Sequence, residues 1–342
     1  MLQKYFALVA VLCTTLSLSA MTGGQPEELG NVQWNRKMEN AVALSKQSGK
    51  PILILFQEVP GCMTCRNYGN FVLRHPLIVE AIESQFVPLA IYNNKGGADA
   101  KALQYFKEPA WNNPVVRIIN ESKQDIIPRI NGNYSALGLV QGMIHALDLR
   151  GSVPPAYLEI LQQELRAQVT GTEKANFSMY CFWTGEKELG QIEGVLSTRP
   201  GFMDGREVVE VEYDPLLVSL TDLTEKAKEA RCAGNVYVDD PNLQKDAAMV
   251  VGRGAVKNTS RFRPDGEPKY YLSKTAYKYL PMTPLQRTKA NALIGKGVQP
   301  DALLSPRQLK LFTAIQNNPK KKWKDTIGED FEKAWNACMA IL

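Results

Sequence analysis

Histidine is scarce in this sequence of 342 residues, which contains only His75 and His145. A structural zinc site needs four ligands, drawn mostly from cysteine and histidine. One close cysteine pair is present, Cys62 and Cys65, and no second close pair accompanies it in the same part of the sequence. The sequence therefore gives little support for zinc and predicts neither a metal nor another cofactor.

Long apolar runs are also missing, since no segment after the first two dozen residues reaches the roughly 18 residues that a membrane span needs. The beginning, MLQKYFALVAVLCTTLSLSA, has one lysine, a short apolar run and small residues up to Ala20. This pattern predicts a signal peptide over residues 1–22, with an uncleaved anchor as the alternative. Leu12 precedes Cys13 where a lipoprotein site has a small residue, so we expect no lipid there. We expect a secreted or periplasmic protein without stable membrane insertion after cleavage.

Internal repeats, low-complexity segments and a strong excess of one charge are absent. The net charge of +5 is mildly basic, and its one charge run, KKKWK at 320–324, is typical of a solvated helix boundary. We therefore expect no nucleic-acid partner, although that run leaves a weak alternative. A chain of 342 residues exceeds one ordinary core, which predicts two domains with appendages.

The first part of the chain alternates helical and strand patterns. Helices are predicted at 34–48, 64–86 and 134–150, and strands at 50–58, 87–94 and 112–120. The run KPILILFQE is apolar throughout its centre, which is typical of a strand buried on both faces. This alternation predicts an α/β layer.

Cys62-Met63-Thr64-Cys65 at a strand-to-helix junction, with Pro114 at the start of a later strand, resembles the thioredoxin family. The VPGC sequence is similar to a thioredoxin-like group in which selenocysteine can take the position of Cys62. The resemblance implies a thioredoxin-like domain over residues 31–150. It also implies a cis Asn113–Pro114 bond, with Pro114 beside the pair at the substrate-binding surface.

The cysteine pair predicts redox chemistry. A thiol at a helix N-terminus faces unpaired backbone N–H groups, which stabilise its thiolate. We therefore predict that Cys62 is the exposed nucleophile and that Cys65 resolves the mixed disulfide. A structural disulfide is one alternative, although a two-residue loop restrains little chain entropy. Half of a zinc site is the other alternative.

A helical linker is predicted at 151–172, and a second α+β domain at 173–281. Within it, Cys181-Phe182-Trp183, Gly194-Val195, Pro200-Gly201-Phe202 and the strand from Glu207 to Tyr213-Asp214-Pro215 resemble the A-type peptide methionine sulfoxide reductases. The later segment DGEPKYYLSKTAYKYL, at 265–280, is a weaker match to the tyrosine-bearing segment of that family.

This second resemblance implies a site for reducing a sulfoxide, of the S epimer in that family. Cys181 would attack the sulfur, and Glu207 would supply a proton to the oxygen. The residues that would bind the substrate are Phe182, Trp183, Tyr270 and Tyr271. Cys232 is the candidate thiol that would attack oxidised Cys181 and form a disulfide with it. On the strand predicted at 207–213, alternation places Glu207 on an otherwise apolar face.

The sequence also departs from that family. Tyr180 replaces a small residue before the nucleophile, Thr184 replaces a glycine, and Phe202 replaces a tyrosine. The stretch 234–254 has no counterpart in the family pattern. A fold retained as a binding surface without catalysis is therefore the alternative reading of this half.

Residues 282–342 are predicted to form a helical extension. Thr283-Pro284 and Ser305-Pro306 each combine a capping residue with a proline suited to the first helical turn. Cys338 lies at helical spacing from Phe331 and Trp335, which predicts a packing role.

Together these patterns predict an exported thiol oxidoreductase whose thioredoxin-like domain supplies electrons to a methionine sulfoxide reductase-like domain. Joining the two in one chain would raise the effective concentration of the donor thiol to about millimolar. The expected partners are oxidised proteins or peptides and an upstream thiol reductase. The alternative is a thioredoxin-like disulfide reductase with a non-catalytic substrate-binding second half.

Overall fold

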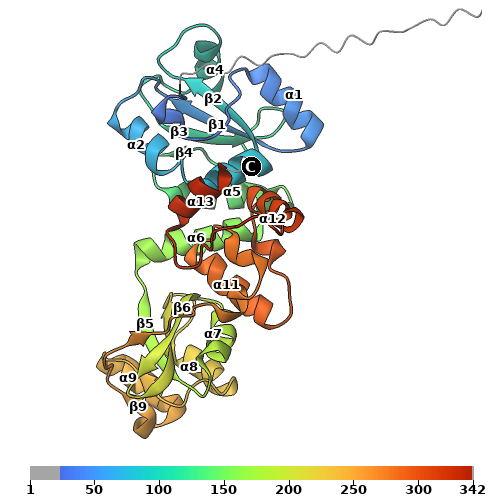
Figure 1. The fold of residues 1–342 in the computed structure, drawn as a ribbon. Helices are drawn as coiled ribbons and strands as arrows, with labels where there is room; N and C mark the ends of the chain where they lie inside the picture. The colour runs from blue at the N-terminus through green and yellow to red at the C-terminus, as the bar shows by residue number, and fades with distance from the viewer. Residues whose placement is uncertain (1–23, 341–342) are drawn as a thin grey trace, which may run out of the picture.

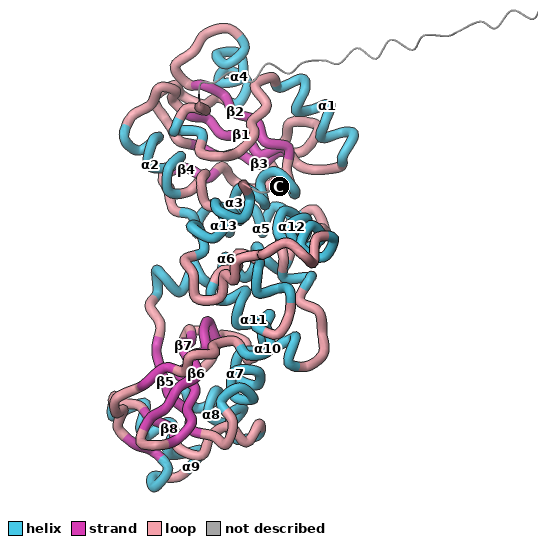
Figure 2. Tube along the Cα trace, in the orientation of Figure 1, coloured by secondary structure: helices cyan, strands magenta, loops and turns pink. Residues whose placement is uncertain are grey.

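A computed structural model describes residues 24–340 of the chain. The predicted signal peptide at 1–22, with Cys13, lies outside the described residues. Figure 1 shows a sheet at each end of an elongated molecule, with a layer of helices between the two sheets. Figure 2 shows the same division, with the strands gathered in the two end regions.

The α-helices follow in chain order: α1 (Met38–Ser48), α2 (Met63–Phe71), α3 (Pro76–Gln85), α4 (Ala98–Phe106), α5 (Ala136–Leu149), α6 (Ala156–Thr170), α7 (Phe182–Gly190), α8 (Leu220–Glu229), α9 (Pro241–Val251), α10 (Tyr270–Ser273), α11 (Pro284–Gly295), α12 (Pro306–Asn317) and α13 (Phe331–Met339). Short 3-10 helices are η1 (Glu27–Leu29), η2 (Arg253–Ala255), η3 (Ala276–Tyr279) and η4 (Asp301–Leu303).

The first sheet has the order β2-β1-β3-β4, with bounds β1 (Ile52–Gln57), β2 (Val87–Tyr92), β3 (Val115–Ile119) and β4 (Ile130–Asn131). Strands β1 and β2 are parallel, whereas β3 runs antiparallel to β1. Leu53 and Leu55 point into one apolar core, while Ile54 and Phe56 point into another on the opposite face. The prediction of a strand buried on both faces is confirmed.

The prediction of one helix over residues 64–86 is wrong, because two helices occupy that range. Helix α2 ends at Phe71 and α3 begins at Pro76. A proline lacks the N–H that would continue a helix and disfavours helical geometry at the preceding residue. His75 accordingly has an extended backbone and precedes the first turn of α3. Helix α1 also begins at Met38, four residues later than the pattern predicts, and ends before Gly49 as expected.

The second sheet has the order β10-β6-β7-β5-β8-β9, with bounds β5 (Glu173–Ser178), β6 (Val195–Met203), β7 (Arg206–Tyr213), β8 (Val236–Tyr237), β9 (Val256–Lys257) and β10 (Arg263–Pro264). Its central strands are antiparallel. Val209, Val211 and Tyr213 belong to the core that also includes residues of α7 and α8. Since side chains alternate along a strand, Glu207 begins this face of β7, as predicted.

Helix α6 contributes to two cores. Tyr157 and Leu161 are buried in the core of the first domain. Ile160, on another face of α6, packs with Leu196 of β6 and Leu285 of α11. The linker predicted at 151–172 is therefore a packed helix, joined to both domains by apolar contacts.

The helical extension begins as the capping patterns predict. Thr283 and Ser305 each form a capping box at the start of α11 and α12, with Gln286 and Gln308 as the reciprocal partners. Helix α11 then packs on α7 and β6 of the second domain. At the other end of the extension, Trp335 of α13 is buried in the core of the first domain.

No helix within residues 24–340 is both long enough and apolar enough to cross a bilayer.

We predict that Trp335→Ala destabilises the protein by about 3–5 kcal/mol, the usual effect of removing a buried aromatic ring. Trp335 is 6% exposed and packs against Phe331, with ring centroids 5.7 Å apart. The matched control is Trp111→Ala, because Trp111 is 82% exposed and should change stability little. Urea unfolding of both variants, followed by far-ultraviolet circular dichroism, measures the difference. Equal stability of the two variants would contradict the packing role of α13.

Candidate functional site

The Cys62 thiol lies at the N-cap position of α2 and is exposed, as predicted. Its pKa is lowered, chiefly by the backbone N–H of Cys65, with further hydrogen bonding from the Cys65 side chain and from Thr64. Partial burial acts in the opposite direction. The helix N-terminus therefore favours the thiolate at Cys62, which is the state that attacks a disulfide.

Cys65 lies one turn further into α2 and is buried. Its Sγ is 3.6 Å from the Sγ of Cys62, and both thiols are free. Burial, followed by the hydrogen bond to Cys62, raises the pKa of Cys65 to about 12. The two thiols thus differ in exposure and acidity in the direction that the predicted roles require.

The Asn113–Pro114 peptide bond is cis, which confirms the prediction from the thioredoxin resemblance. The Asn113 side chain contacts the redox pair directly, because Cys65 Sγ donates a hydrogen bond to Asn113 Oδ1 at 2.6 Å. The sequence analysis did not identify Asn113 as a contact, although its position before Pro114 is a usable signal. Val59–Pro60 in the VPGC sequence is a second cis bond, which we did not predict.

A carboxylate also lies beside the pair. One carboxylate oxygen of Glu58 and the sulfur atoms of Cys62 and Cys65 all lie within 4.8 Å of one another. Within residues 24–340, these three side chains are the one set close enough together to bind a metal ion. Two thiolates and one carboxylate would leave a zinc ion one ligand short of its usual four.

The Cys181 thiol lies at the N-cap position of α7, directly after β5, and is partly exposed. Glu207, from the start of β7, reaches this helix terminus: its Oε2 accepts a hydrogen bond from the backbone N–H of Phe182 at 2.8 Å. The backbone of Glu207 also accepts a bond from Met179. The candidate nucleophile and the candidate acid are therefore positioned at one end of α7, on the same side of the sheet.

Aromatic side chains pack around the same helix terminus. Trp183 stacks on Tyr270 with ring centroids 4.0 Å apart and an interplanar angle of 14°. Phe182 packs edge-on against both Trp183 and Phe202. Tyr271 contacts Tyr270 edge-on. The aromatic residues that the sequence assigned to the substrate site thus form one cluster, with an apolar ring at the position of Phe202.

Cys232 lies after α8 and is buried. Burial is the main cause that raises its pKa to about 11, followed by the charges of Glu188 and, more weakly, Cys181. Cys232 belongs to the same apolar core as Phe182, the residue that follows Cys181. Helix α8, which precedes Cys232, is capped by Ser219 and ends at Glu229.

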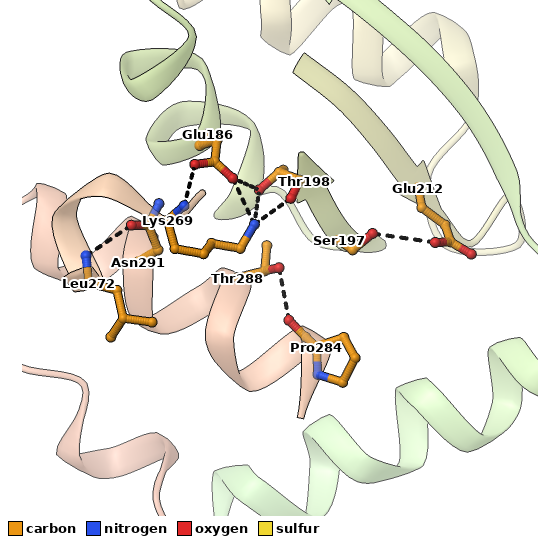
Figure 3. A network of polar contacts seen from close by, with 9 residues as sticks. All are labelled: Glu186, Ser197, Thr198, Glu212, Lys269, Leu272, Pro284, Thr288 and Asn291. Carbon is orange, nitrogen blue, oxygen red and sulfur yellow. Dashed lines mark hydrogen bonds and ion pairs between the residues drawn. The ribbon is translucent and has the colours of Figure 1, made fainter. Parts of the chain in front are cut away.

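A buried ion pair, absent from the sequence analysis, holds the tyrosine segment in place (Figure 3). Lys269 Nζ donates to Glu186 Oε1 at 2.7 Å and to Thr198 Oγ1 at 2.8 Å. The Lys269 backbone N–H donates to Glu186 Oε2 at 2.9 Å. Glu186 belongs to α7, five residues after Cys181, and Lys269 directly precedes Tyr270. A lysine next to the tyrosine pair was the only sequence signal for this contact.

The two thiol sites lie in different parts of the molecule. Helix α2, which carries Cys62 and Cys65, is in the end region with the first sheet, whereas α7, which follows Cys181, is in the other (Figure 1). Helix α6 and part of the extension occupy the layer between these regions.

Comparison with protein families agrees with the geometry of the first site. A family described as thioredoxin-like matches residues 33–121. This range includes the redox pair and the cis Asn113–Pro114 bond. The first domain is therefore thioredoxin-like.

The second half is similar to methionine sulfoxide reductases. The peptide methionine sulfoxide reductase MsrA of Methanococcus maripaludis strain C5 is 39% identical over 72 residues, which cover 16% of this chain and 46% of the relative. MsrA 1 of a Nostoc species is 40% identical over 68 residues, covering 15% of this chain and 42% of the relative. The chain thus spans less than half the length of these curated relatives. The second domain is an MsrA-like α+β domain.

Two solved structures are also similar in part. The DsbH oxidoreductase is 19% identical, with a TM-score of 0.31, and covers 38% of this chain and 94% of its own. Methionine sulfoxide reductase A of Corynebacterium diphtheriae is 21% identical, with a TM-score of 0.24, and covers 31% of this chain and 76% of its own.

We predict that alkylation of the fully reduced protein at mildly acidic pH labels Cys62 well before Cys65. The lowered pKa of Cys62 supplies thiolate there, whereas burial and a pKa of about 12 keep Cys65 protonated. Mass spectrometry after a short iodoacetamide pulse at a series of pH values measures both sites. Preferential labelling of Cys65 would reverse the assigned roles.

We predict that Lys269→Met destabilises the second domain by about 3–5 kcal/mol, because Glu186 remains buried without its partner. Changing both residues, Glu186→Gln with Lys269→Met, should recover much of that loss, since no unpaired charge is left. Lys274→Met is the matched control, because the Lys274–Glu267 pair is exposed and contributes about 0–1 kcal/mol. Chemical unfolding measures all three. If Lys269→Met matches the Lys274 variant, the buried pair does not support the domain.

Proposed function

We propose that this chain is a thiol-dependent oxidoreductase that reduces methionine sulfoxide at Cys181 with electrons from the Cys62–Cys65 pair. The observation that carries the proposal is the arrangement at the start of α7. There, Cys181 is the N-cap residue and the Glu207 carboxylate is bound to the next N–H, 2.8 Å away. The similarity to MsrA enzymes supports the same reading.

The chemistry begins with attack of the Cys181 sulfur on the sulfoxide sulfur. The sulfoxide oxygen becomes a good leaving atom only when it is protonated, so a donor must lie beside the nucleophile. Glu207 Oε2 accepts the Phe182 N–H, and its second oxygen, Oε1, is the atom that would hold the proton. The net result is a thioether and a Cys181 sulfenic acid, so the substrate gains two electrons and Cys181 loses two.

The aromatic cluster would bind the substrate methyl group and exclude water. Trp183, two residues after Cys181, is held against Tyr270 and offers a ring surface for that methyl group. A hydroxyl from Tyr270 or Tyr271 would donate a second hydrogen bond to the sulfoxide oxygen. Lys269 and Glu186 act only by positioning this tyrosine segment against α7.

Return of Cys181 to the thiol needs two further electrons. A thiol attacks the sulfenic acid and releases water, leaving a disulfide. Cys232 is the candidate within the domain, and the Cys62–Cys65 pair would then reduce that disulfide. The pair in turn would receive electrons from an upstream thiol reductase.

A second candidate function is thiol–disulfide exchange by the first domain, with the second half binding substrates without catalysis. One observation favours it: Phe202, in place of a tyrosine, packs its ring against Phe182 at 5.4 Å and offers no hydroxyl to a sulfoxide. In this case Cys62 and Cys65 would act on protein disulfides and Cys181 would be dispensable.

We also propose that the protein is exported, on the pattern of residues 1–22 alone. Oxidised proteins or peptides would then be its substrates outside the cytoplasm. Fractionation of cells that express the full chain, with N-terminal sequencing of the product, tests this. An unprocessed N-terminus in the cytoplasmic fraction would overturn it.

We predict that Cys181→Ser reduces turnover of methionine sulfoxide with dithiothreitol to the rate without enzyme. Cys338→Ser is the control and should retain wild-type turnover, because this thiol packs near the backbone oxygen of Tyr279 in the extension. Release of methionine measures the rate. If the wild-type protein is no faster than Cys181→Ser, thiol–disulfide exchange by the first domain is the favoured function. A disulfide-reduction assay of Cys62 then tests that function.

We predict that Glu207→Gln lowers the rate of sulfoxide reduction by about 10²-fold or more, the effect of losing a general acid. The amide oxygen can still accept the Phe182 N–H, so the fold should persist. Glu210→Gln is the matched control, because Glu210 lies on the other face of β7 and pairs with Arg199. Single-turnover measurements under saturating substrate compare the two. Equal rates would remove Glu207 from the reaction.

A further inference from the structure

Helix α6 is fixed to both domains along its length. Its burial in the first core and its contacts with Leu196 and Leu285 hold it from opposite sides. Arg166 adds an ion pair to Asp214 at the end of β7, at 2.9 Å, and the Asp214 side chain is fully buried. Glu164 accepts the Leu285 N–H at 2.8 Å, at the start of α11. The connection between the domains is therefore built around a packed helix, α6, with contacts to both sides.

The extension crosses back and adds a second brace. Arg307, at the start of α12, pairs with Glu80 at 3.0 Å and also with Glu83, both on α3 of the first domain. Trp335 of α13 is buried in the first core, while α11 packs on α7 of the second domain. Separating or rotating the two domains would break these buried contacts together.

These contacts between the domains determine which thiols can come into contact. Disulfide exchange requires sulfur atoms in contact, and an S–S bond is about 2 Å long. The α2 and α7 termini lie in opposite end regions, and α6 is one helix of the layer between them (Figure 1). A single helix with its side chains is about 10 Å across. Cys62 therefore cannot reach Cys181 of its own chain while the braces hold.

We propose that the Cys62–Cys65 pair of one chain reduces Cys181 of a second copy of the chain. This inference rests on the proposed sulfoxide reductase function and names its electron donor. It also replaces the expectation that fusion raises the effective concentration of the donor, since the two sites of one chain are held apart.

The surroundings of both thiols fit a reaction between chains. Cys62 is exposed, and its neighbour Met63 is 65% exposed. Trp111, two residues before the Asn113 that contacts Cys65, is 82% exposed. On the acceptor side, Tyr180 is 98% exposed directly before Cys181. Each sulfur thus has an unpartnered apolar side chain beside it, which a second protein surface can cover.

The difference in burial between Cys181, which is partly exposed, and Cys232, which is buried, also determines the order of steps. Because Cys232 is buried, the Cys62 thiolate attacks the Cys181 sulfur of a Cys181–Cys232 disulfide and forms a mixed disulfide between chains, releasing the Cys232 thiolate. Cys65 then attacks the sulfur of Cys62. The products are a Cys62–Cys65 disulfide in the donor and, after the released thiolates take up protons, two thiols in the acceptor. One electron pair has moved from one chain to the other.

Two variants with complementary losses test the transfer. The acceptor is Cys62→Ser/Cys65→Ser, which keeps Cys181 and Cys232, and the donor is Cys181→Ser, which keeps the pair. Both are reduced, freed of dithiothreitol and given excess methionine sulfoxide. The acceptor alone should release about one methionine per chain. Adding one equivalent of donor should raise the yield to about two and oxidise the donor pair, whereas Cys62→Ser/Cys65→Ser/Cys181→Ser should add nothing.

Wild-type protein supplies the second measurement. Its first methionine uses Cys181 and Cys232, and its second needs the Cys62–Cys65 pair. Transfer between chains predicts that tenfold dilution slows the second phase about tenfold and leaves the first phase unchanged. A second phase unaffected by dilution, together with a variant mixture that stops at one equivalent, would overturn the proposal and leave the reductase function standing. Wild type that releases no methionine would overturn both.

Discussion

The position of α6 is the constraint on which the arrangement of the whole molecule depends. An exposed helix buries one apolar stripe, and a helix with apolar residues on more than one face must be covered from more than one side. Leu158 and Leu161 enter the core of the first domain, and Ile160 and Ala167 enter a small core shared with the second. Because neither domain alone covers both faces, the helix determines how far apart the Cys62 and Cys181 sites lie.

The two candidate nucleophiles occupy the same kind of position at the start of a helix. Cys62 and Cys181 are the N-cap residues of α2 and α7, and each follows a central strand of its own sheet. At this position the first backbone N–H groups of the helix have no partner within the helix. At α2 they lower the pKa of Cys62. At α7 the N–H of Phe182 instead donates a hydrogen bond to the Glu207 carboxylate.

The sequence predicted the elements that its local patterns specify. Strand β1 is continuous and apolar, the caps at Thr283 and Ser305 are paired with glutamines three residues later, and the pair Cys62–Cys65 follows a strand. The contacts that join distant segments were not predictable in this way. Glu186 and Lys269 are 83 residues apart, and nothing in the local pattern at either position indicates that the other will be buried beside it.

The same limit of local sequence patterns explains why one long helix was predicted over residues 64–86. Residues 64–86 keep apolar spacing across His75, so periodicity alone favours one helix, and only the backbone chemistry of Pro76 divides it. The division also affects the helical extension, because the acidic residues of the separate helix α3 face α12. Glu80 is 3% exposed and would be costly to bury without a cation. Arg307 supplies that cation from 227 residues further along the chain, so a proline at 76 and an arginine at the start of α12 together fix the extension to the first domain.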